Sequence, residues 1–240
     1  MHEYIQNPLL LHPARPETYS TDPTIDRSSF RKHHLRVYVL AVGALSVYVY
    51  EEMLSLFSSK PYTLTDLDDL GVHLTNTCLQ EGVQEAGGDE VAVSMASHPE
   101  QIRRQIHHIL ATLFDFVAQN DPVNLQLLPN AFELFGVDFL VDEHLKVWLL
   151  EINAVQSTSL SSPMTLLESP EHGPDFSQTG DTLKPIISRL FRSTLGVLKA
   201  EYPALLGGRS PAAVAADSTS PAILPGFHQV LQLQTGLAFR

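Results

Sequence analysis

Two apolar segments in the middle of the chain carry acidic and amide side chains where ordinary core strands carry none. Residues 132–141 and 145–153 are rich in Val, Leu, Phe and Ile, and a short polar turn between them predicts a hairpin. Asp138 lies in the first predicted strand, and Glu151 and Asn153 lie in the second. Because isolated charges are costly to bury, this hairpin must either expose these groups or bind something with them.

The spacing of these residues predicts that their side chains meet. Side chains alternate between the two faces of a strand, so Glu151 and Asn153 share a face. A hairpin folded about His144 and Leu145 places Asp138 opposite Glu151, with Cβ atoms roughly 5 Å apart. Like charges in that position destabilise a sheet unless a cation lies between them, and oxygen donors without Cys or His favour Mg²⁺ or Mn²⁺. The alternative is that these carboxylates are solvated on an outer face, or that one of them caps a turn.

The composition excludes several classes of protein. The chain has 240 residues, of which 44% are hydrophobic, enough for one large domain or two small ones. Its 27 acidic against 15 basic side chains argue against a general nucleic-acid surface. Cys78 is the single cysteine, so an intramolecular disulfide is excluded. We find neither a membrane-spanning stretch nor a signal peptide at the start, and therefore expect a soluble, cytoplasmic protein.

The rest of the chain alternates between strands, helices and irregular segments. Residues 36–42 and 45–50 predict a first hairpin. Pro99 and the apolar spacing of residues 98–119 predict a helix with one buried face, and residues 183–198 return to a helical period. Three further segments have no such period: residues 12–30 are predicted as a loop, 155–173 as an insertion and 204–240 as a disordered tail.

A basic run stands at the beginning of the first hairpin. In an extended segment Lys32, His34 and Arg36 point to the same face. On a chain with a net charge of −12 they make a local positive patch, suited to ATP phosphates or to an acidic peptide tail. The alternative is an ordinary solvated surface run.

Four segments, in this order along the chain, carry a resemblance to a known family. They are Tyr4-Ile5 with Pro8-Leu9-Leu10-Leu11, then Arg31-Lys32-His33-His34-Leu35-Arg36, then His73-Leu74-Thr75-Asn76, and last the two strands that hold Asp138, Glu151 and Asn153. Together they strongly resemble the tubulin-tyrosine ligase family of the ATP-grasp superfamily. The resemblance implies an α+β fold in which this chain supplies the C-terminal part of the catalytic domain. That part would be a mainly antiparallel sheet with flanking helices, incomplete at the N-terminus and extending over residues 1–203.

The resemblance also implies an activity and a set of site residues. Members of this family ligate an amino acid to a protein carboxylate: ATP phosphorylates the carboxylate, and an amine then attacks the acylphosphate. The expected partners are a free amino acid and tubulin, or another protein with an acidic C-terminal tail. The resemblance also implies that the protein associates with microtubules. The implied roles are Mg²⁺ binding for Asp138, Glu151 and Asn153, adenine contact for Tyr4 and Ile5, phosphate or acceptor contact for Lys32 and Arg36, and nucleotide or amino-acid contact for Thr75 and Asn76.

The chain departs from the family pattern at two positions that touch the amino acid in tyrosine-adding members. His34 stands where the usual Lys-x-Asp-x-Arg has Asp, and the arginine expected near residues 54–58 is absent. Tyrosine specificity therefore does not carry over. The 240 residues also lack the family's N-terminal region, so we expect no ligase turnover by this chain alone. The alternative function is a catalytically inactive module that binds a nucleotide or tubulin.

Overall fold

One antiparallel sheet organises the chain in the computed structural model, which describes residues 4–19, 27–75, 93–94, 99–125, 127–154, 180–202 and 226–233. Within these residues the strands are β1 (Leu10–His12), β2 (Arg15–Tyr19), β3 (Arg31–Val42), β4 (Ser46–Tyr50), β5 (Leu54–Phe57), β6 (Val93–Ser94), β7 (Phe132–Val141), β8 (Val147–Ala154) and β9 (Phe227–Gln232). The helices are α1 (Leu70–His73), α3 (Glu100–Asn120), α4 (Pro122–Leu125) and α6 (Gly180–Glu201), with a short 3-10 turn, η1 (Arg27–Ser29).

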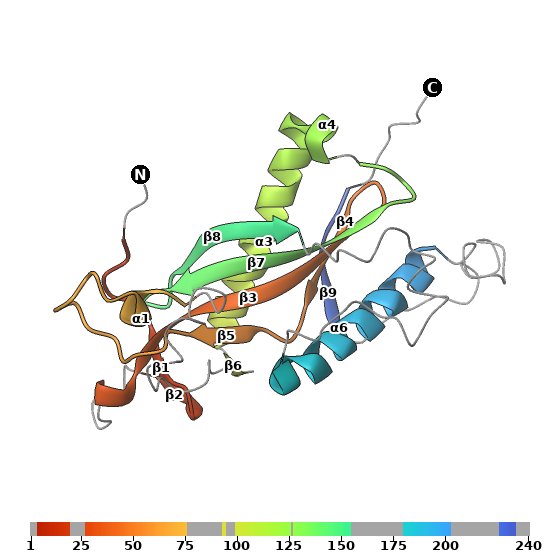
Figure 1. Ribbon diagram of the computed structural model, residues 1–240. Coiled ribbons are helices and arrows are strands. Elements are labelled where there is room, and N and C mark those ends of the chain that lie inside the picture. Colours follow the sequence, from red (N-terminus) through yellow and green to blue (C-terminus); the bar gives the residue numbers. More distant parts are fainter. Residues whose placement is uncertain are drawn as a thin grey trace.

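The long strand β3 is the centre of the sheet (Figure 1). On one side it pairs with β7 from Leu35 to Val42. On its other side, β5 pairs with the first half of β3 and β4 with the second half. The strand β8 lies beyond β7, and β9 lies beyond β4. Both predicted hairpins, β3–β4 and β7–β8, are therefore present.

Two helices cover opposite faces of this sheet. In Figure 1, α3 runs behind the strands and α6 lies in front of them at one end. Alternate residues of β3 belong to two separate cores, since Val37 and Val39 pack with α3 whereas Tyr38 and Leu40 pack with α6. The buried stripe of α3 follows a spacing of four residues, as expected for a helix with one apolar face: Ile102, Ile106, Leu110, Phe114 and Ala118.

The face covered by α6 is divided along its length. Beyond Tyr38, toward the start of β3, the same face continues through Arg36, His34 and Lys32. The sheet therefore has an apolar half beneath α6 and a polar half beside it, and the polar half holds the candidate site.

The α+β class and the mainly antiparallel sheet agree with the prediction, but several boundaries differ. The helix predicted over 98–119 is α3, which begins at Glu100 and has Pro99 as its N-cap. The loop predicted over 12–30 contains the strand β2, and the tail predicted over 204–240 contains β9, which pairs with β4. The insertion predicted over 155–173 lies outside the described residues.

None of the described helices combines the length and the apolar character that a membrane span requires.

Candidate nucleotide and metal site

The register of β7 and β8 places Asp138 opposite Glu151, as the sequence predicted, but through a different turn. Near the turn, Val141 pairs with Val147 and Phe139 with Leu149, so the hairpin is centred on His144 alone. The register then shifts by one residue, with Leu150 as the extra residue of β8. This bulge brings Asp138 and Glu151 into opposition.

The oxygen groups of the predicted metal site differ in exposure. Asp138 is only 4% exposed, whereas Glu151 and Asn153 are exposed. The side-chain amide of Asn153 donates to Glu151 Oε1 at 2.9 Å, so the Asn153 oxygen is the amide atom left to meet a cation. Among the described residues no three His, Cys, Asp or Glu side chains gather as a metal site. A cation here would take two carboxylates and one amide from the protein, a donor set that fits Mg²⁺.

Asp138 is also the partner of a cation of the protein. Arg36 lies opposite it on β3, and the guanidinium donates through Nε to Oδ1 and through Nη2 to Oδ2, the latter at 2.9 Å. Burial lowers the pKa of Arg36, but the hydrogen bond and the charge of Asp138 outweigh burial and raise it. The positive charge beside Asp138 is therefore permanent.

His34 lies next to this pair and is buried. Its Nε2 is 3.6 Å from Asp138 Oδ1, and its Nδ1 is 2.6 Å from Thr75 Oγ1. Burial first, and the charge of Arg36 second, lower the pKa of His34 to about 4. The imidazole is consequently uncharged at neutral pH and links Thr75 to the polar half of the sheet.

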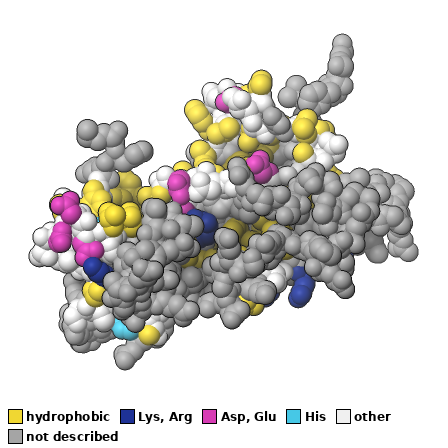
Figure 2. Space-filling model, viewed as in Figure 1, with side chains coloured by type: hydrophobic (Ala, Val, Ile, Leu, Met, Phe, Trp, Pro, Cys, Tyr) yellow, Lys and Arg dark blue, Asp and Glu magenta, His cyan; other side chains and the backbone are white. Residues whose placement is uncertain are grey.

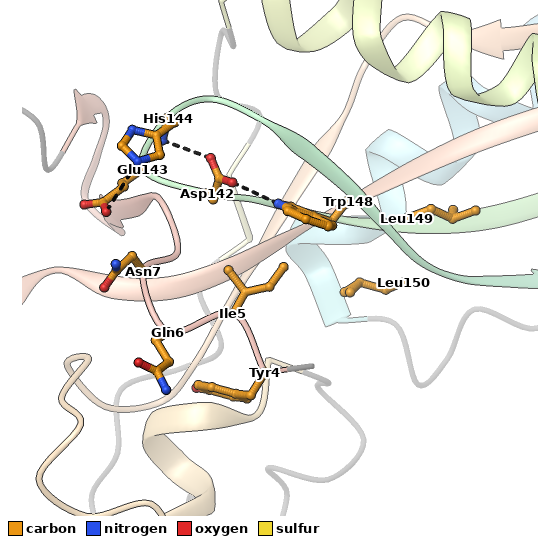
Figure 3. A pocket seen from close by; sticks show the side chains of 10 residues that line it. All are labelled: Tyr4, Ile5, Gln6, Asn7, Asp142, Glu143, His144, Trp148, Leu149 and Leu150. Carbon is orange, nitrogen blue, oxygen red and sulfur yellow. Dashed lines mark hydrogen bonds and ion pairs between the residues drawn. The ribbon is translucent and has the colours of Figure 1, made fainter. Parts of the chain in front are cut away.

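A pocket of about 890 Å³ opens beside this cluster (Figure 3). Its lining comes from three parts of the chain: the segment before β1, the β7–β8 turn and β8. In Figure 3 the side chains of Tyr4 and Ile5 lie across from those of Trp148 and Leu150. The walls thus combine aromatic and aliphatic surface, as in many sites for flat ligands. Figure 2 shows hydrophobic side chains gathered at this N-terminal end of the molecule, with acidic side chains beside them.

The turn that forms one wall of the pocket is held firmly. Asp142 Oδ1 accepts from the backbone N–H groups of His144 and Lys146, and Asp142 Oδ2 accepts from Trp148 Nε1 at 3.0 Å. These bonds lower the pKa of Asp142 although burial opposes them. The ammonium of Lys146 lies 3.7 Å from the centroid of the Trp148 ring and makes a cation–π contact with one face of the indole.

The structure brings most of the predicted site residues to one region. Lys32 Nζ is 3.4 Å from the hydroxyl of Tyr4 and 4.6 Å from the centroid of its ring. On the polar half of the sheet, Arg36, Asp138, Glu151 and Asn153 lie on neighbouring strands, with Thr75 attached through His34. Asn76 lies outside the described residues.

Sequence reasoning did not single out Trp148, Leu150 and His73. Trp148 and Leu150 stand in the same strand as Glu151, so their nearness to the site could have been inferred from the hairpin. His73 belongs to a motif whose next residues were assigned, but its contact with Tyr4 joins residues 69 positions apart. No local sequence pattern predicts such a contact.

Comparison with known proteins identifies the family of the chain. A family model described as the tubulin-tyrosine ligase family matches residues 1–169. The chain is 38% identical over 206 residues to the probable tubulin–tyrosine ligase PBY1 of Saccharomyces cerevisiae, covering 80% of this chain and 23% of that protein. It is 36% identical over 196 residues to the probable tubulin–tyrosine ligase C12B10.04 of Schizosaccharomyces pombe, covering 80% and 40% respectively.

A solved structure shares the fold. The C-terminal domain of Pby1 from K. lactis, described as an ATP-grasp enzyme interacting with the mRNA decapping enzyme Dcp2, superposes with a TM-score of 0.56 at 30% identity. The match covers 97% of this chain and 52% of that one, so the chain spans about half or less of the relatives it matches. The family model, the relatives and the shared fold together show that the chain belongs to the tubulin-tyrosine ligase family.

Proposed function

We propose that this chain carries the nucleotide and metal site of an ATP- and Mg²⁺-dependent ligase that joins a free amino acid to a carboxylate of a protein. The observation that supports it best is the continuity of one strand. Trp148 and Leu150 of β8 line the pocket, and the next polar residues of the same strand, Glu151 and Asn153, lie opposite or beside Asp138. A ring bound in the pocket would have its phosphates directed toward these oxygen groups and Lys32.

The residues of the site suit phosphoryl transfer, in which a protein acts mainly through position and charge. Asp138, Glu151 and Asn153 would hold Mg²⁺, which when bound neutralises charge on the phosphates. Lys32 adds a cation beside Tyr4, which lines the pocket. Arg36 is tied to Asp138, so we assign it to orienting that carboxylate, with acceptor contact through its exposed edge.

The acceptor we propose is a protein with an acidic C-terminal tail, tubulin first. Lys32 and Arg36, whose charge Asp138 partly balances, form a basic strip on a chain whose net charge is −12, and the exposed cation of Lys32 favours an acidic peptide. Because Pby1 of K. lactis interacts with Dcp2, an mRNA decapping enzyme is a second partner to test in binding experiments.

Calorimetric titration of the purified chain with ATP, with and without Mg²⁺, tests the site. Glu151→Gln keeps the size of the side chain but removes its charge, and we expect it to lower Mg²⁺-dependent ATP affinity by about tenfold or more at unchanged melting temperature. Glu133→Gln, at an exposed position on the neighbouring strand β7, is the matched control and should bind like the wild type. Equal Mg²⁺-dependent affinity in both variants would remove Glu151 from the site.

A nucleotide-binding module without ligase activity is a second candidate. The observation that favours it is the Arg36–Asp138 pair, since a metal ion must share Asp138 with this guanidinium. ATP-dependent incorporation of labelled amino acids into tubulin separates the two. Incorporation that Glu151→Gln abolishes supports the ligase. Because this chain alone is expected not to turn over, ATP binding without incorporation supports the module only when the assayed protein also contains the family's N-terminal region.

A further inference from the structure

His73 has no part in the site described so far, yet it contacts that site directly. It is the last residue of α1 and is buried. Its Nε2 is 2.9 Å from the backbone oxygen of Asp66, and its Nδ1 is 2.7 Å from the hydroxyl of Tyr4, which lines the pocket. The imidazole therefore connects the loop before α1 to the pocket wall.

The direction of these hydrogen bonds follows from their chemistry. A backbone carbonyl can only accept, so His73 Nε2 carries the hydrogen and donates it to Asp66. In an uncharged imidazole with its hydrogen on Nε2, Nδ1 is an acceptor. The hydroxyl of Tyr4 must then donate to Nδ1, and its lone pairs are left for other donors. One carbonyl on the loop thus fixes the tautomer of His73 and the polarity of the Tyr4 hydroxyl.

That polarity matters to Lys32. Its ammonium lies 3.4 Å from the Tyr4 oxygen and 4.6 Å from the centroid of the Tyr4 ring. An ammonium only donates, so it requires an oxygen that presents a lone pair, and the bond from Tyr4 to His73 leaves the lone pairs of Tyr4 free. With the other tautomer, Nδ1–H would compete with Lys32 for the same lone pairs.

Aromatic packing holds the plane of the imidazole, and the two hydrogen bonds decide which nitrogen faces Tyr4. The rings of Tyr4 and Tyr62 each meet the His73 ring edge-on, with centroids 5.8 and 5.9 Å away. The Tyr62 hydroxyl donates to the backbone oxygen of Gln6 at 2.7 Å, which anchors the pocket segment a second time. Tyr62 thus holds the backbone of that segment and also lies beside the Tyr4 hydroxyl, whereas His73 accepts from that hydroxyl through Nδ1.

We propose that His73 is a positioning residue of the nucleotide site: through a directed hydrogen-bond chain from the Asp66 carbonyl, it orients Tyr4 and, through the Tyr4 hydroxyl, Lys32. This inference rests on the proposed function for its consequence, which is tighter binding of ATP. The series of hydrogen bonds from Asp66 to Lys32 rests only on the contacts given above.

Substitutions that copy one ring nitrogen each test the proposal. The amide of Asn reaches the position of Nδ1 and can accept from Tyr4, whereas the amide of Gln reaches the position of Nε2 and can donate to Asp66. We expect His73→Gln and Tyr4→Phe to weaken ATP binding by about 3- to 10-fold, the range of one net hydrogen bond. His73→Asn should recover part of the affinity that His73→Ala loses. Because a purely structural role would not distinguish Asn from Gln by ATP affinity at equal melting temperature, equal affinities of these two variants would overturn the proposal.

Tyr202→Phe is the matched control for Tyr4→Phe, because Tyr202 donates to the Ala131 carbonyl at the other end of the sheet. It should leave ATP affinity unchanged. The tautomer is measured separately, from the ¹⁵N shifts of the His73 ring in the wild type and in Tyr4→Phe. Hydrogen on Nε2, with an Nδ1 chemical shift that responds to Tyr4→Phe, supports the hydrogen-bond series from Asp66 to Lys32. It does so even if the protein binds no ATP and the proposed function fails. Hydrogen on Nδ1 overturns it in either case.

Discussion

The guanidinium of Arg36 and the carboxylate of Asp138 face each other across β3 and β7 and form two parallel hydrogen bonds. Asp138 is 4% exposed, and the Arg36 side chain is 28% exposed. Since Asp138 is a proposed metal ligand, the same contact bears on both stability and binding.

Replacing Arg36 by Ala should destabilise the fold strongly. The substitution leaves Asp138 buried without its charged partner, which we expect to cost about 2 to 3 kcal/mol after allowance for the partial exposure of Arg36. The free energy of unfolding from urea titration at neutral pH measures this cost. Arg189→Ala is the matched control, because Arg189 makes a similar two-bond pair with Glu52 on the surface, where solvent screens the charges and a much smaller loss is expected. Equal losses in the two variants would contradict a special role for burial.

His34 should make the metal-free protein less stable in mild acid. Its pKa is about 4 in the fold, against an ordinary value of 6.5, so below pH 6.5 the unfolded chain binds a proton that the folded chain does not. The contribution is fully present above pH 6.5 and is lost as the pH falls toward 4, by up to about 3 kcal/mol. Unfolding titrations in EDTA between these pH values should give a flatter pH dependence for His34→Gln than for the wild type. Parallel curves would show that His34 is not the group responsible.

Binding of an acidic peptide should depend on Lys32 and on salt. We expect a tubulin C-terminal peptide to bind more weakly as ionic strength rises from about 0.05 M to about 0.5 M, because exposed charges are screened over roughly 8 Å at physiological salt. Lys32→Glu should abolish most of that dependence. Lys60→Glu is a suitable control, since Lys60 pairs with Asp69 outside the proposed strip. Salt-insensitive binding, or equal effects of both variants, would count against the strip as the acceptor site.

Trp148 should report nucleotide binding directly. It is the single tryptophan of the chain, it lines the pocket, and it is 37% exposed. A base stacking nearby would displace water from the indole and alter its contact with Lys146. We expect ATP to change the intensity or the wavelength of tryptophan emission, with a midpoint equal to the calorimetric dissociation constant. Unchanged emission at saturating ATP would place the nucleotide away from this pocket.

The parts of the fold that depend on local pattern were predictable. The two hairpins follow from alternating apolar residues, and α3 follows from an apolar stripe after Pro99. The strand β2 was missed because Pro16 lies within it, and proline is tolerated only at edges of a sheet. The strand β9 was missed because only Phe227 of its residues is buried, so its sequence has no clear alternation of buried and exposed residues. Its pairing with β4 stabilises it as a strand.

The candidate site also has parts that the sequence predicts and parts that it does not. The opposition of Asp138 and Glu151 could be counted from the sequence, although the bulge at Leu150 could not, because a run of apolar residues does not reveal which one is unpaired. Contacts such as His73 with Tyr4 depend on how distant segments pack. Such contacts are decided by tertiary structure, and no periodicity encodes them.

The bulged strand β8 also sets the distance between the pocket wall and the proposed metal ligands. From Trp148 at the pocket wall to Asn153, the farthest donor, is five residues, or at most about 17 Å because the bulge at Leu150 shortens the strand. A ligand that touches both ends must therefore have a matching length between its ring and its charged end. If ATP binds as proposed, Glu151 next to the pocket wall would meet the nearer phosphates and Asn153 the farther ones, so a nucleotide with fewer phosphates would lose the contact at Asn153.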